Sequence, residues 1–268
     1  MEFIYNRTSI GYSHIECGIV CQDYSEIFAN ENYKIVTACD GHGGIIYIRS
    51  DRGAKFASQS VKDVITKYSI EKLENLILID ALDKIKLEIL CRWNQLVEED
   101  YSNNPFSFEE LQKLSENDVF KLSNNYILAY GTTLNAAILT DKYLISIQIG
   151  DGGMFFIYDN NMQIVFPEND ENVANITNSL CGDDAYSNLF IKSVEKDEYK
   201  GIILCTDGLL GPYQTYSNFY EKFVIPFINK FKNNNKKIFK ELNEYIDNLA
   251  TKIGIGDDVS FATIIYDF

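Results

Sequence analysis

Three strand-like segments of this sequence each lead into an aspartate followed by a glycine. The pairs are Asp40-Gly41 after residues 33–39, Asp151-Gly152 after Tyr143–Ile149, and Asp207-Gly208 after Gly201–Cys205. One such pair is most simply a turn, because glycine lets the backbone reverse tightly. Three pairs far apart in the chain, with Asp257 before the last apolar run at 259–266, indicate more. Carboxylate oxygens are preferred ligands of Mg²⁺ and Mn²⁺, so we expect a divalent-cation site at one edge of a sheet.

The elements that must position these aspartates are short strands and amphipathic helices. Apolar runs at 132–140, 143–149 and 154–158 are separated by only two and four residues, which allows antiparallel neighbours but no parallel crossover. Helical spacing of apolar residues predicts helices at 54–65, about 70–97 and 238–249. Polar stretches at 98–104 and 167–184 are expected to be loops, and Asn233–Asn235 a connection between helices. Because strands and helices are clustered, we expect antiparallel sheet covered by helices, in one domain spanning 1–268.

Composition excludes some classes of partner. The chain has 24 Lys and Arg against 39 Asp and Glu, a net charge of −15, which repels nucleic acid and anionic membranes. A phosphorylated substrate would be repelled as well, unless bound cations reverse the charge locally. No apolar run approaches the roughly 18 residues that span a bilayer, and the N-terminus lacks the pattern of a signal peptide. We therefore expect a cytoplasmic protein whose six scattered cysteines are free, mostly buried thiols.

Five motifs that contain these aspartates occur in a fixed order along the chain. They are Cys39-Asp40-Gly41-His42-Gly43-Gly44, Gly131-Thr132-Thr133, Gly150-Asp151-Gly152, Thr206-Asp207-Gly208 and Asp257-Asp258-Val259-Ser260. Together they resemble the successive motifs of the metal-dependent protein phosphatases, the PPM or type 2C family. The segments Gly11-Tyr12-Ser13-His14, Cys21-Gln22-Asp23 and Arg49-Ser50-Asp51-Arg52-Gly53-Ala54 resemble its bacterial branch. The resemblance extends over nearly the whole chain.

The resemblance implies an α+β fold: a four-layer sandwich of two packed antiparallel sheets flanked by pairs of helices. It also implies two Mn²⁺ or Mg²⁺ ions at one edge of the sandwich, with a possible weaker third. The implied ligands are Asp40 bridging both ions, the carbonyl oxygen of Gly41, Asp207 and Asp257 on one ion, Asp23 on the other directly or through water, and Asp151 with Asp207 on the third.

The implied activity is hydrolysis of phosphoserine and phosphothreonine in proteins. Two cations held close together convert the water between them to hydroxide at neutral pH and absorb charge on the phosphoryl oxygens. His42, in the glycine-rich turn two residues after Asp40, would protonate the departing oxygen as general acid. The expected partners are phosphorylated proteins and a functionally opposed serine/threonine kinase.

Two departures from the family pattern concern substrate and metal binding. Gln22 stands where many members have glutamate, and a neutral amide is a weaker ligand for a hard ion. The arginine that grips the substrate phosphate in many members would fall near Gly18. Candidates for its replacement are His14, Arg49, Arg52 and Lys55. Of the remaining motif residues, Thr133 is expected to hydrogen-bond a ligand carboxylate, and Asp258 to support Asp257.

Two other functions are compatible with these residues. A catalytically weak or inactive relative could bind phosphorylated proteins as a scaffold, and Gln22 with the missing arginine favours that interpretation. A metal-dependent phosphatase of a small phosphate ester would have the same metal site. The acidic segment 167–184 lies where the family places a variable flap, and Asp183 or Asp184 could approach a third ion there.

Overall fold

The computed structural model describes residues 2–158, 161–166, 177–232 and 237–266. It contains two five-stranded sheets, and every pair of neighbouring strands is antiparallel. In spatial order, the first sheet consists of β1 (Phe3–Ser9), β10 (Val259–Ile265), β9 (Gly201–Cys205), β6 (Gly153–Tyr158) and β7 (Asn161–Ile164). The second consists of β2 (Tyr24–Ala29), β3 (Lys34–Cys39), β4 (Leu134–Leu139), β5 (Tyr143–Ile149) and β8 (Phe190–Glu195).

The two sheets pack face to face because their strands alternate between two apolar surfaces. In β3, Val36 and Ala38 face the other sheet, where they join Phe156 and Leu204 in the central core. Ile35 in the same strand points the opposite way, into a second core beneath the helices. Successive side chains of a strand point to opposite faces, so a strand buried on both faces reads as a continuous apolar run.

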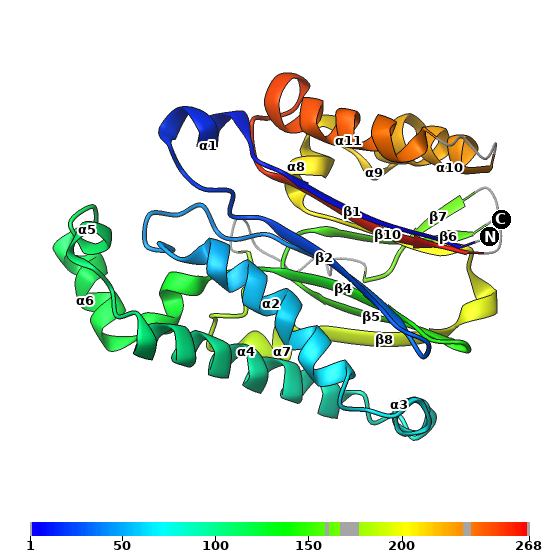
Figure 1. Ribbon diagram of the computed structural model, residues 1–268, viewed down its shortest axis with the longest axis horizontal. Helices are drawn as coiled ribbons and strands as arrows, with labels where there is room; N and C mark the ends of the chain where they lie inside the picture. The colour runs from blue at the N-terminus through cyan, green and yellow to red at the C-terminus, as the bar shows by residue number, and fades with distance from the viewer. Residues whose placement is uncertain (1, 159–160, 167–176, 233–236, 267–268) are drawn as a thin grey trace.

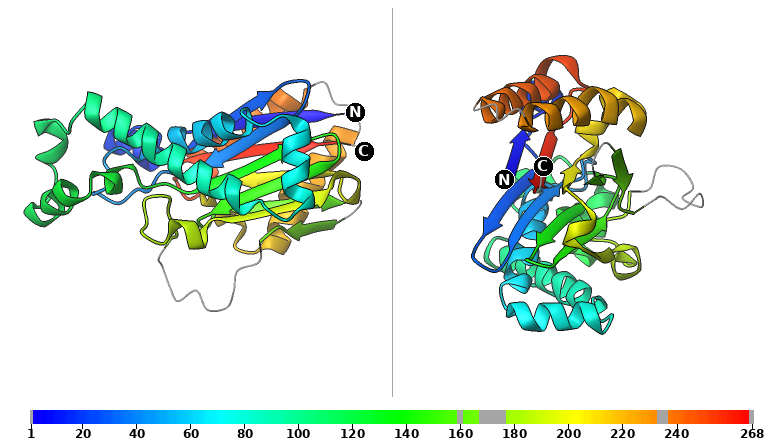
Figure 2. Two further views of the ribbon diagram at one scale, coloured as in Figure 1. Left: turned by 90° about the horizontal axis from the view of Figure 1, so that it is seen from below. Right: turned by 90° about the vertical axis from the view of Figure 1, so that its right-hand side faces the viewer.

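Helices cover the outer face of each sheet (Figures 1 and 2). The second sheet is covered by α2 (Ser50–Ile65) and α4 (Asp83–Asn103), whose Trp93 is fully buried and donates its indole N–H to the Gly53 carbonyl oxygen at 3.1 Å. The first sheet is covered by α8 (Asp207–Leu210), α9 (Tyr216–Phe219), α10 (Ile225–Lys232) and α11 (Ile238–Asn248). The prediction of a four-layer α+β sandwich is confirmed.

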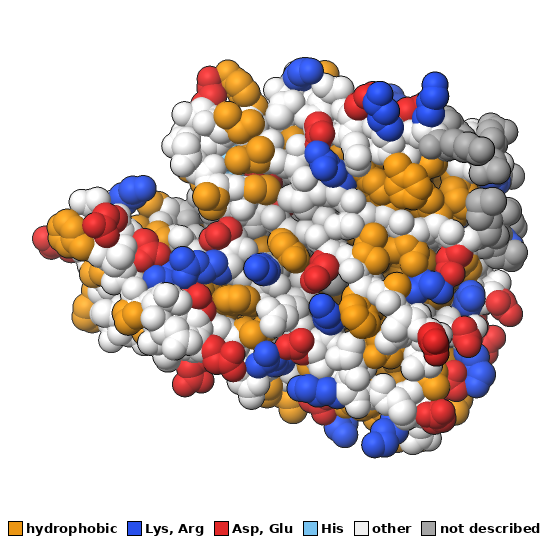
Figure 3. Space-filling model, viewed as in Figure 1, with side chains coloured by type: hydrophobic (Ala, Val, Ile, Leu, Met, Phe, Trp, Pro, Cys, Tyr) orange, Lys and Arg blue, Asp and Glu red, His pale blue; other side chains and the backbone are white. Residues whose placement is uncertain are grey.

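The remaining helices lie at the ends of the sandwich, except α7 (Ala185–Asn188), which packs beside α4. They are α1 (Tyr12–Cys17), α3 (Ile70–Leu78), α5 (Phe108–Leu111), α6 (Glu116–Asn124) and α7 (Ala185–Asn188). Short 3₁₀ and π segments stand at 126–130, 196–198, 211–213, 220–224 and 249–253. The helices α5 and α6 project from the end opposite the chain termini, and the surface is hollowed between them and α1 (Figures 1 and 3).

Several predicted boundaries were wrong. The expected helix at about 70–97 is two helices, because Asp80 adopts a left-handed conformation (φ 53°) between α3 and α4. The expected loop at 98–104 is the last part of α4 up to Asn103.

Of the six free cysteines, Cys17 and Cys91 are exposed rather than buried. The connection at Asn233–Asn235 and most of the predicted flap, 167–176, lie outside the described residues.

Candidate metal centre

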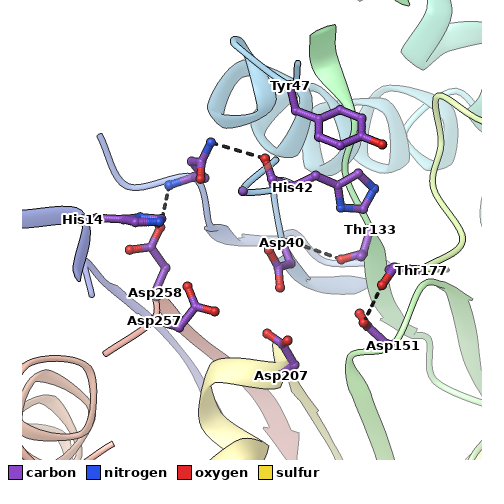
Figure 4. Close-up of a pocket in the computed structure, with 13 residues that line it drawn as sticks. His14, Asp40, His42, Tyr47, Thr133, Asp151, Thr177, Asp207, Asp257 and Asp258 are labelled. Atoms are coloured by element: carbon purple, nitrogen blue, oxygen red, sulfur yellow. Dashed lines mark hydrogen bonds and ion pairs between the residues drawn. The ribbon is translucent and has the colours of Figure 1, made fainter. Parts of the chain in front are cut away.

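A cavity of about 490 Å³ opens at the end of the sandwich opposite the chain termini. Its acidic side chains come from both sheets: Asp40 follows β3, Asp151 follows β5, Asp207 begins α8 after β9, and Asp257 precedes β10. The full lining is His14, Gln22, Asp40, Gly41, His42, Gly43, Tyr47, Thr133, Asp151, Thr177, Asp207, Asp257 and Asp258 (Figure 4). Thus the aspartates from the separate strand ends do lie around one space.

The backbone around Asp40 is fixed by close packing. Thr133 donates its backbone N–H to the Asp40 carbonyl oxygen at 2.8 Å, and its hydroxyl oxygen accepts the Asp40 N–H at 3.0 Å. A side chain on Gly41 would lie 2.6 Å from the Gln22 carbonyl oxygen and 2.8 Å from the Ser50 backbone, so only glycine fits there. Thr133 was predicted to hydrogen-bond a carboxylate side chain. In the structure it holds the backbone of Asp40 instead.

The cavity concentrates negative charge. Burial, reinforced by the carboxylates of Asp23 and Asp207, raises the pKa of Asp40 well above its usual range. Burial also raises the pKa of Asp257, with Asp207 adding to the shift. None of the described residues that line the cavity is Lys or Arg. These carboxylates therefore repel one another, and a cation among them would relieve both the repulsion and the cost of burial.

This donor set fits a hard divalent cation, because the cavity offers several carboxylate oxygens and no thiolate. Within the described ranges, no three carboxylate, imidazole or thiol groups already converge at the spacing of a closed ion cage. The donors surround the cavity on short side chains, as Figure 4 shows for Asp40, Asp207 and Asp257.

Asp23 does not line the cavity. It is buried beneath it, and its carboxylate accepts a 2.8 Å hydrogen bond from the Thr206 hydroxyl, next to Asp207. Burial raises the pKa of Asp23, and the hydrogen bond from Thr206 opposes the shift. Asp23 therefore lies behind Thr206 and does not contact the cavity directly.

Asp258 ties the N-terminal segment to the cavity. One carboxylate oxygen accepts the Gly11 N–H at 2.7 Å, and the other accepts the Gln22 N–H at 2.6 Å. His14 Nδ1 lies 2.9 Å from that second oxygen, so His14 is paired with an acid of the cavity. The side-chain amide of Gln22 donates from Nε2 to the Ser50 hydroxyl at 2.6 Å and to the His42 carbonyl oxygen at 3.3 Å. Gln22 therefore links the Asp258 cluster to the loop that carries His42.

His42 is held at the cavity by its backbone and by an aromatic neighbour. Its N–H donates to the Gly131 carbonyl oxygen at 3.1 Å, and its ring meets that of Tyr47 edge to face at 4.9 Å between centroids. Burial lowers the pKa of His42, whereas the carboxylates of Asp151 and Asp207 oppose that shift. The net result is a His42 pKa below its ordinary value, and the ring lines the cavity beside these acids.

Two predicted phosphate contacts are engaged elsewhere. The Arg49 side chain is 3% exposed, and its Nε lies 2.7 Å from a Glu110 carboxylate oxygen. Its Nη1 donates to the Tyr130 hydroxyl at 2.7 Å, and the guanidinium stacks on Phe106. Arg52 pairs with Asp100 at 2.9 Å. These pairs connect the start of α2 to α4 and α5, and neither arginine lines the cavity.

Comparison with known proteins identifies the family. The family model described as protein phosphatase 2C matches residues 10–247. The chain belongs to the protein phosphatase 2C family. It is accordingly an enzyme of the protein phosphatase class, as the motifs predicted. No curated protein sequence matches the chain.

Solved structures of similar fold are bacterial phosphatases of low sequence identity. A bacterial serine phosphatase is 16% identical, with a TM-score of 0.61 over 100% of this chain and 98% of that one. The Mycobacterium tuberculosis serine/threonine phosphatase PstP/Ppp is 15% identical, with a TM-score of 0.59 over 100% and 99%. Stp1 from Staphylococcus aureus is 16% identical, with a TM-score of 0.59 over 100% and 96%. At such identity the likeness shows the fold alone.

Two residues of this phosphatase cavity were not predicted. Thr177 donates its hydroxyl to a carboxylate oxygen of Asp151 at 2.7 Å, and it belongs to the acidic segment interpreted only as a flap. Tyr47, seven residues after Asp40, stands in the loop that follows the glycine-rich motif, where its ring contacts His42. Asp183 and Asp184 are exposed and do not line the cavity. Lys55 is likewise exposed and away from it.

Proposed function

We propose that this chain hydrolyses phosphoserine and phosphothreonine in proteins, with Mn²⁺ or Mg²⁺ bound in the carboxylate cavity. The observation that carries the proposal is the meeting of Asp40, Asp207 and Asp257, from three separate strand ends, around one cavity without Lys or Arg among its described lining. Membership of the protein phosphatase 2C family supports the reaction class. A serine/threonine phosphatase PstP catalytic domain, 16% identical with a TM-score of 0.57, was solved in complex with two manganese ions.

The proposed metal site holds two ions. Asp40 would contact both, with the Gly41 carbonyl oxygen as a further donor, and Asp207 and Asp257 would complete one of them. Asp23 would act on the second ion through water, since it lies behind Thr206. A weaker third ion would lie beside Asp151 and Asp207. When bound, two such ions supply an acidified water for attack on phosphorus and offset the charge of the phosphoryl oxygens.

The residues of the chain have their own proposed tasks. His42 donates a proton to the serine or threonine oxygen as it departs, because it lines the cavity beside the aspartates and imidazole is the side chain suited to proton transfer near neutral pH. Asp258 fixes His14 and the backbone of Gln22. Thr177 orients Asp151 through its hydroxyl. His14 remains a candidate for contact with the substrate phosphate, whereas Arg49 and Arg52 are committed to Glu110 and Asp100.

The wider setting is part of the same proposal. The chain would act as one domain, in the cytoplasm, against a serine/threonine kinase of the same cell. In the described part of the chain, no helix is long and apolar enough to cross a membrane. A surface with a net charge of −15 disfavours nucleic acid as a partner.

The test is release of phosphate from a phosphothreonine peptide by purified protein with Mn²⁺ or Mg²⁺, before and after excess EDTA. We expect metal-dependent release that EDTA abolishes. Folded protein that binds the phosphopeptide without releasing phosphate would favour the scaffold alternative. A small aryl phosphate turned over far better than every phosphopeptide tried would favour a small-ester phosphatase instead.

A further inference from the structure

The helix α1 lies at the cavity without contributing to the hydrophobic core. The structure describes α1 completely, and none of its residues is buried. Polar contacts hold the helix instead. Its first turn is fixed where Asp258 accepts the Gly11 N–H at 2.7 Å. The Ser13 N–H donates to the Gly256 carbonyl oxygen at 3.0 Å, and the Ser13 hydroxyl donates to the same oxygen at 2.5 Å. His14 pairs with Asp258 from this helix and lines the cavity (Figure 4).

The helix and the segments beside it nevertheless carry a group of exposed apolar side chains. Gly18, with φ 65°, ends α1, and the Ile19 N–H donates back to the His14 carbonyl oxygen at 2.9 Å, so the chain stays against the helix. The π segment at 249–253 lies beside α1. Figure 3 shows apolar side chains gathered over this part of the molecule, next to the hollow between α1 and the helices α5 and α6. The group, called the α1 patch below, consists of Tyr12, Ile15, Ile19, Val20, Ile253 and Ile255, which are 44% to 62% exposed.

Neither the fold nor the attachment of α1 requires these apolar side chains, because the helix is attached by hydrogen bonds. Exposed apolar side chains that stand singly need no explanation, whereas a group of them on one surface marks a place where another molecule binds. The α1 patch therefore indicates a binding surface.

The position of the α1 patch determines what can lie on it. Ile15 follows His14 directly, and Ile255 stands two residues before Asp257; both His14 and Asp257 line the cavity. An extended chain advances about 3.3 to 3.6 Å per residue, so a residue two to four positions from a phosphorylated one lies about 7 to 14 Å from it. When a phosphorylated residue of a protein occupies the cavity, its neighbours in sequence therefore reach the α1 patch.

The charge of the chain favours apolar contacts at this place. Its net charge is −15, and the described lining of the cavity includes no Lys or Arg, so acidic residues beside the phosphorylated one are repelled. Metal ions in the cavity would contact the phosphate, which is the same in every phosphoprotein. Selection among phosphoproteins therefore requires contacts outside the cavity, and burial of apolar surface is favourable whatever the charge of the surroundings.

We propose that the α1 patch binds an apolar side chain of the phosphoprotein substrate, about two to four residues from the phosphorylated serine or threonine. The inference specifies the substrate class of the proposed phosphatase function and rests on that function. Burial of one Leu or Ile side chain on the patch should raise kcat/KM about tenfold relative to a polar residue at the same position.

The test uses pairs of phosphothreonine peptides of equal charge that differ only in Leu or Ser at one position near the phosphothreonine. For wild type we expect kcat/KM about tenfold higher for the best Leu peptide than for its Ser counterpart. In the double variant Ile15→Ser with Ile253→Ser, the two peptides should differ by less than about twofold, with the rate on the Ser peptide unchanged. Leu87→Ser is the matched control, because Leu87 is 52% exposed, like Ile15 at 51%, but lies on α4. The control should keep the full preference for Leu.

Three results would overturn the inference. The first is wild-type protein that hydrolyses no Leu peptide better than its Ser counterpart. The second is a double variant that keeps the preference, or a Leu87→Ser variant that loses it equally. The third is a double variant that keeps the preference while light scattering shows a wild-type dimer becoming a monomer, which would assign the patch to a contact between copies of this chain.

Failure of the proposed function is a separate result. If wild-type protein releases no phosphate from any peptide, the phosphatase proposal fails. Binding of the fluorescently labelled Leu and Ser phosphopeptides to the Mn²⁺-loaded protein, measured by anisotropy, then tests the α1 patch by itself. Tighter binding of the Leu peptide by wild type, lost in the double variant, would support the patch, and equal affinities for the two peptides would refute it. Thermal melts establish that each variant is folded.

Discussion

The two ends of the sandwich each have a cavity with acidic residues, and they differ in what accompanies the acids. At the end with the chain termini, a cavity of about 300 Å³ is lined by Glu2, Glu31 and Asp141 together with Lys34 and Lys196. Lys34 Nζ lies 2.7 Å from a Glu2 carboxylate oxygen. Figure 3 shows acidic and basic side chains intermixed over this end. At the opposite end, five aspartates line the larger cavity, and no Lys or Arg is among its described lining.

The difference separates acids that are neutralised by lysines of the chain from acids that require a bound cation. Acids paired with lysine at a half-exposed surface satisfy each other and add little to stability. Acids buried together without a cationic side chain raise one another's pKa, as at Asp40, and destabilise the fold unless a cation binds. Clusters of buried acids with shifted pKa values occur mostly at functional sites, where binding or catalysis requires them although they lower the stability of the fold.

Neutralising one acid at each end should affect the rate of phosphate release very differently. Asp207→Asn should lower the rate of phosphate release by about 1,000-fold or more, because a charge-stabilising ligand is lost. Asp141→Asn at the opposite end should leave the rate within about twofold of wild type, because only a solvated surface charge changes. The measurement is initial phosphate release from the phosphothreonine peptide at saturating Mn²⁺. Equal effects of the two substitutions would contradict the functional distinction.

The same contrast applies to the ion pairs of the two ends. Arg49→Met should lower the free energy of unfolding by about 3 kcal/mol, because it leaves the partly buried Glu110 without its cation and leaves Asp100 with Arg52 alone. Lys34→Met should cost less than about 1 kcal/mol, because both side chains of its pair are about a third exposed. Urea unfolding monitored by circular dichroism measures both. A larger effect at Lys34 than at Arg49 would be incompatible with the anchoring role of Arg49.

Acid pH should weaken the Arg49 anchor in a defined window. The hydrogen bond from Arg49 lowers the pKa of Glu110 from its usual 4.5 to about 2. The stabilising contribution of this carboxylate is therefore fully present above pH 4.5 and is lost as the pH falls through about 2. The difference in unfolding free energy between wild type and Glu110→Gln should shrink over that range. A constant difference between wild type and Glu110→Gln over that range would refute the assignment.

The positions of the aspartates could be predicted because the signals are local. Asp40, Asp151 and Asp207 each follow an apolar run and precede a glycine, so strand end and turn were both visible in a few residues. The short connections between buried runs predicted antiparallel strands, whereas the packing of two sheets was implied by the resemblance to the protein phosphatase family. The break between α3 and α4 was missed because the left-handed residue there is Asp80, with no glycine or proline to mark it.

The partners of the site residues could not be predicted, because they depend on contacts between distant segments. Arg49 was a candidate phosphate contact until Glu110, 61 positions later, was found against it. Asp23 was predicted to serve an ion directly or through water, but the hydrogen bond to its carboxylate from Thr206, 183 positions away, could not be predicted. Tyr47 was overlooked because nothing in the sequence indicates that its ring and His42 share the surface of Gly131.

We propose that the aspartates without a Lys or Arg partner form a divalent-cation site, whereas the lysine-paired acids at the other end do not. Calorimetric titration of Mn²⁺ into metal-free protein tests it most directly, with wild type, Asp207→Asn and Asp141→Asn compared at equal concentration. We expect wild type and Asp141→Asn to bind Mn²⁺ with equal affinity, and Asp207→Asn to bind it about 100-fold or more weakly. Absence of Mn²⁺ binding by folded wild-type protein, or binding unaffected by Asp207→Asn, would contradict it.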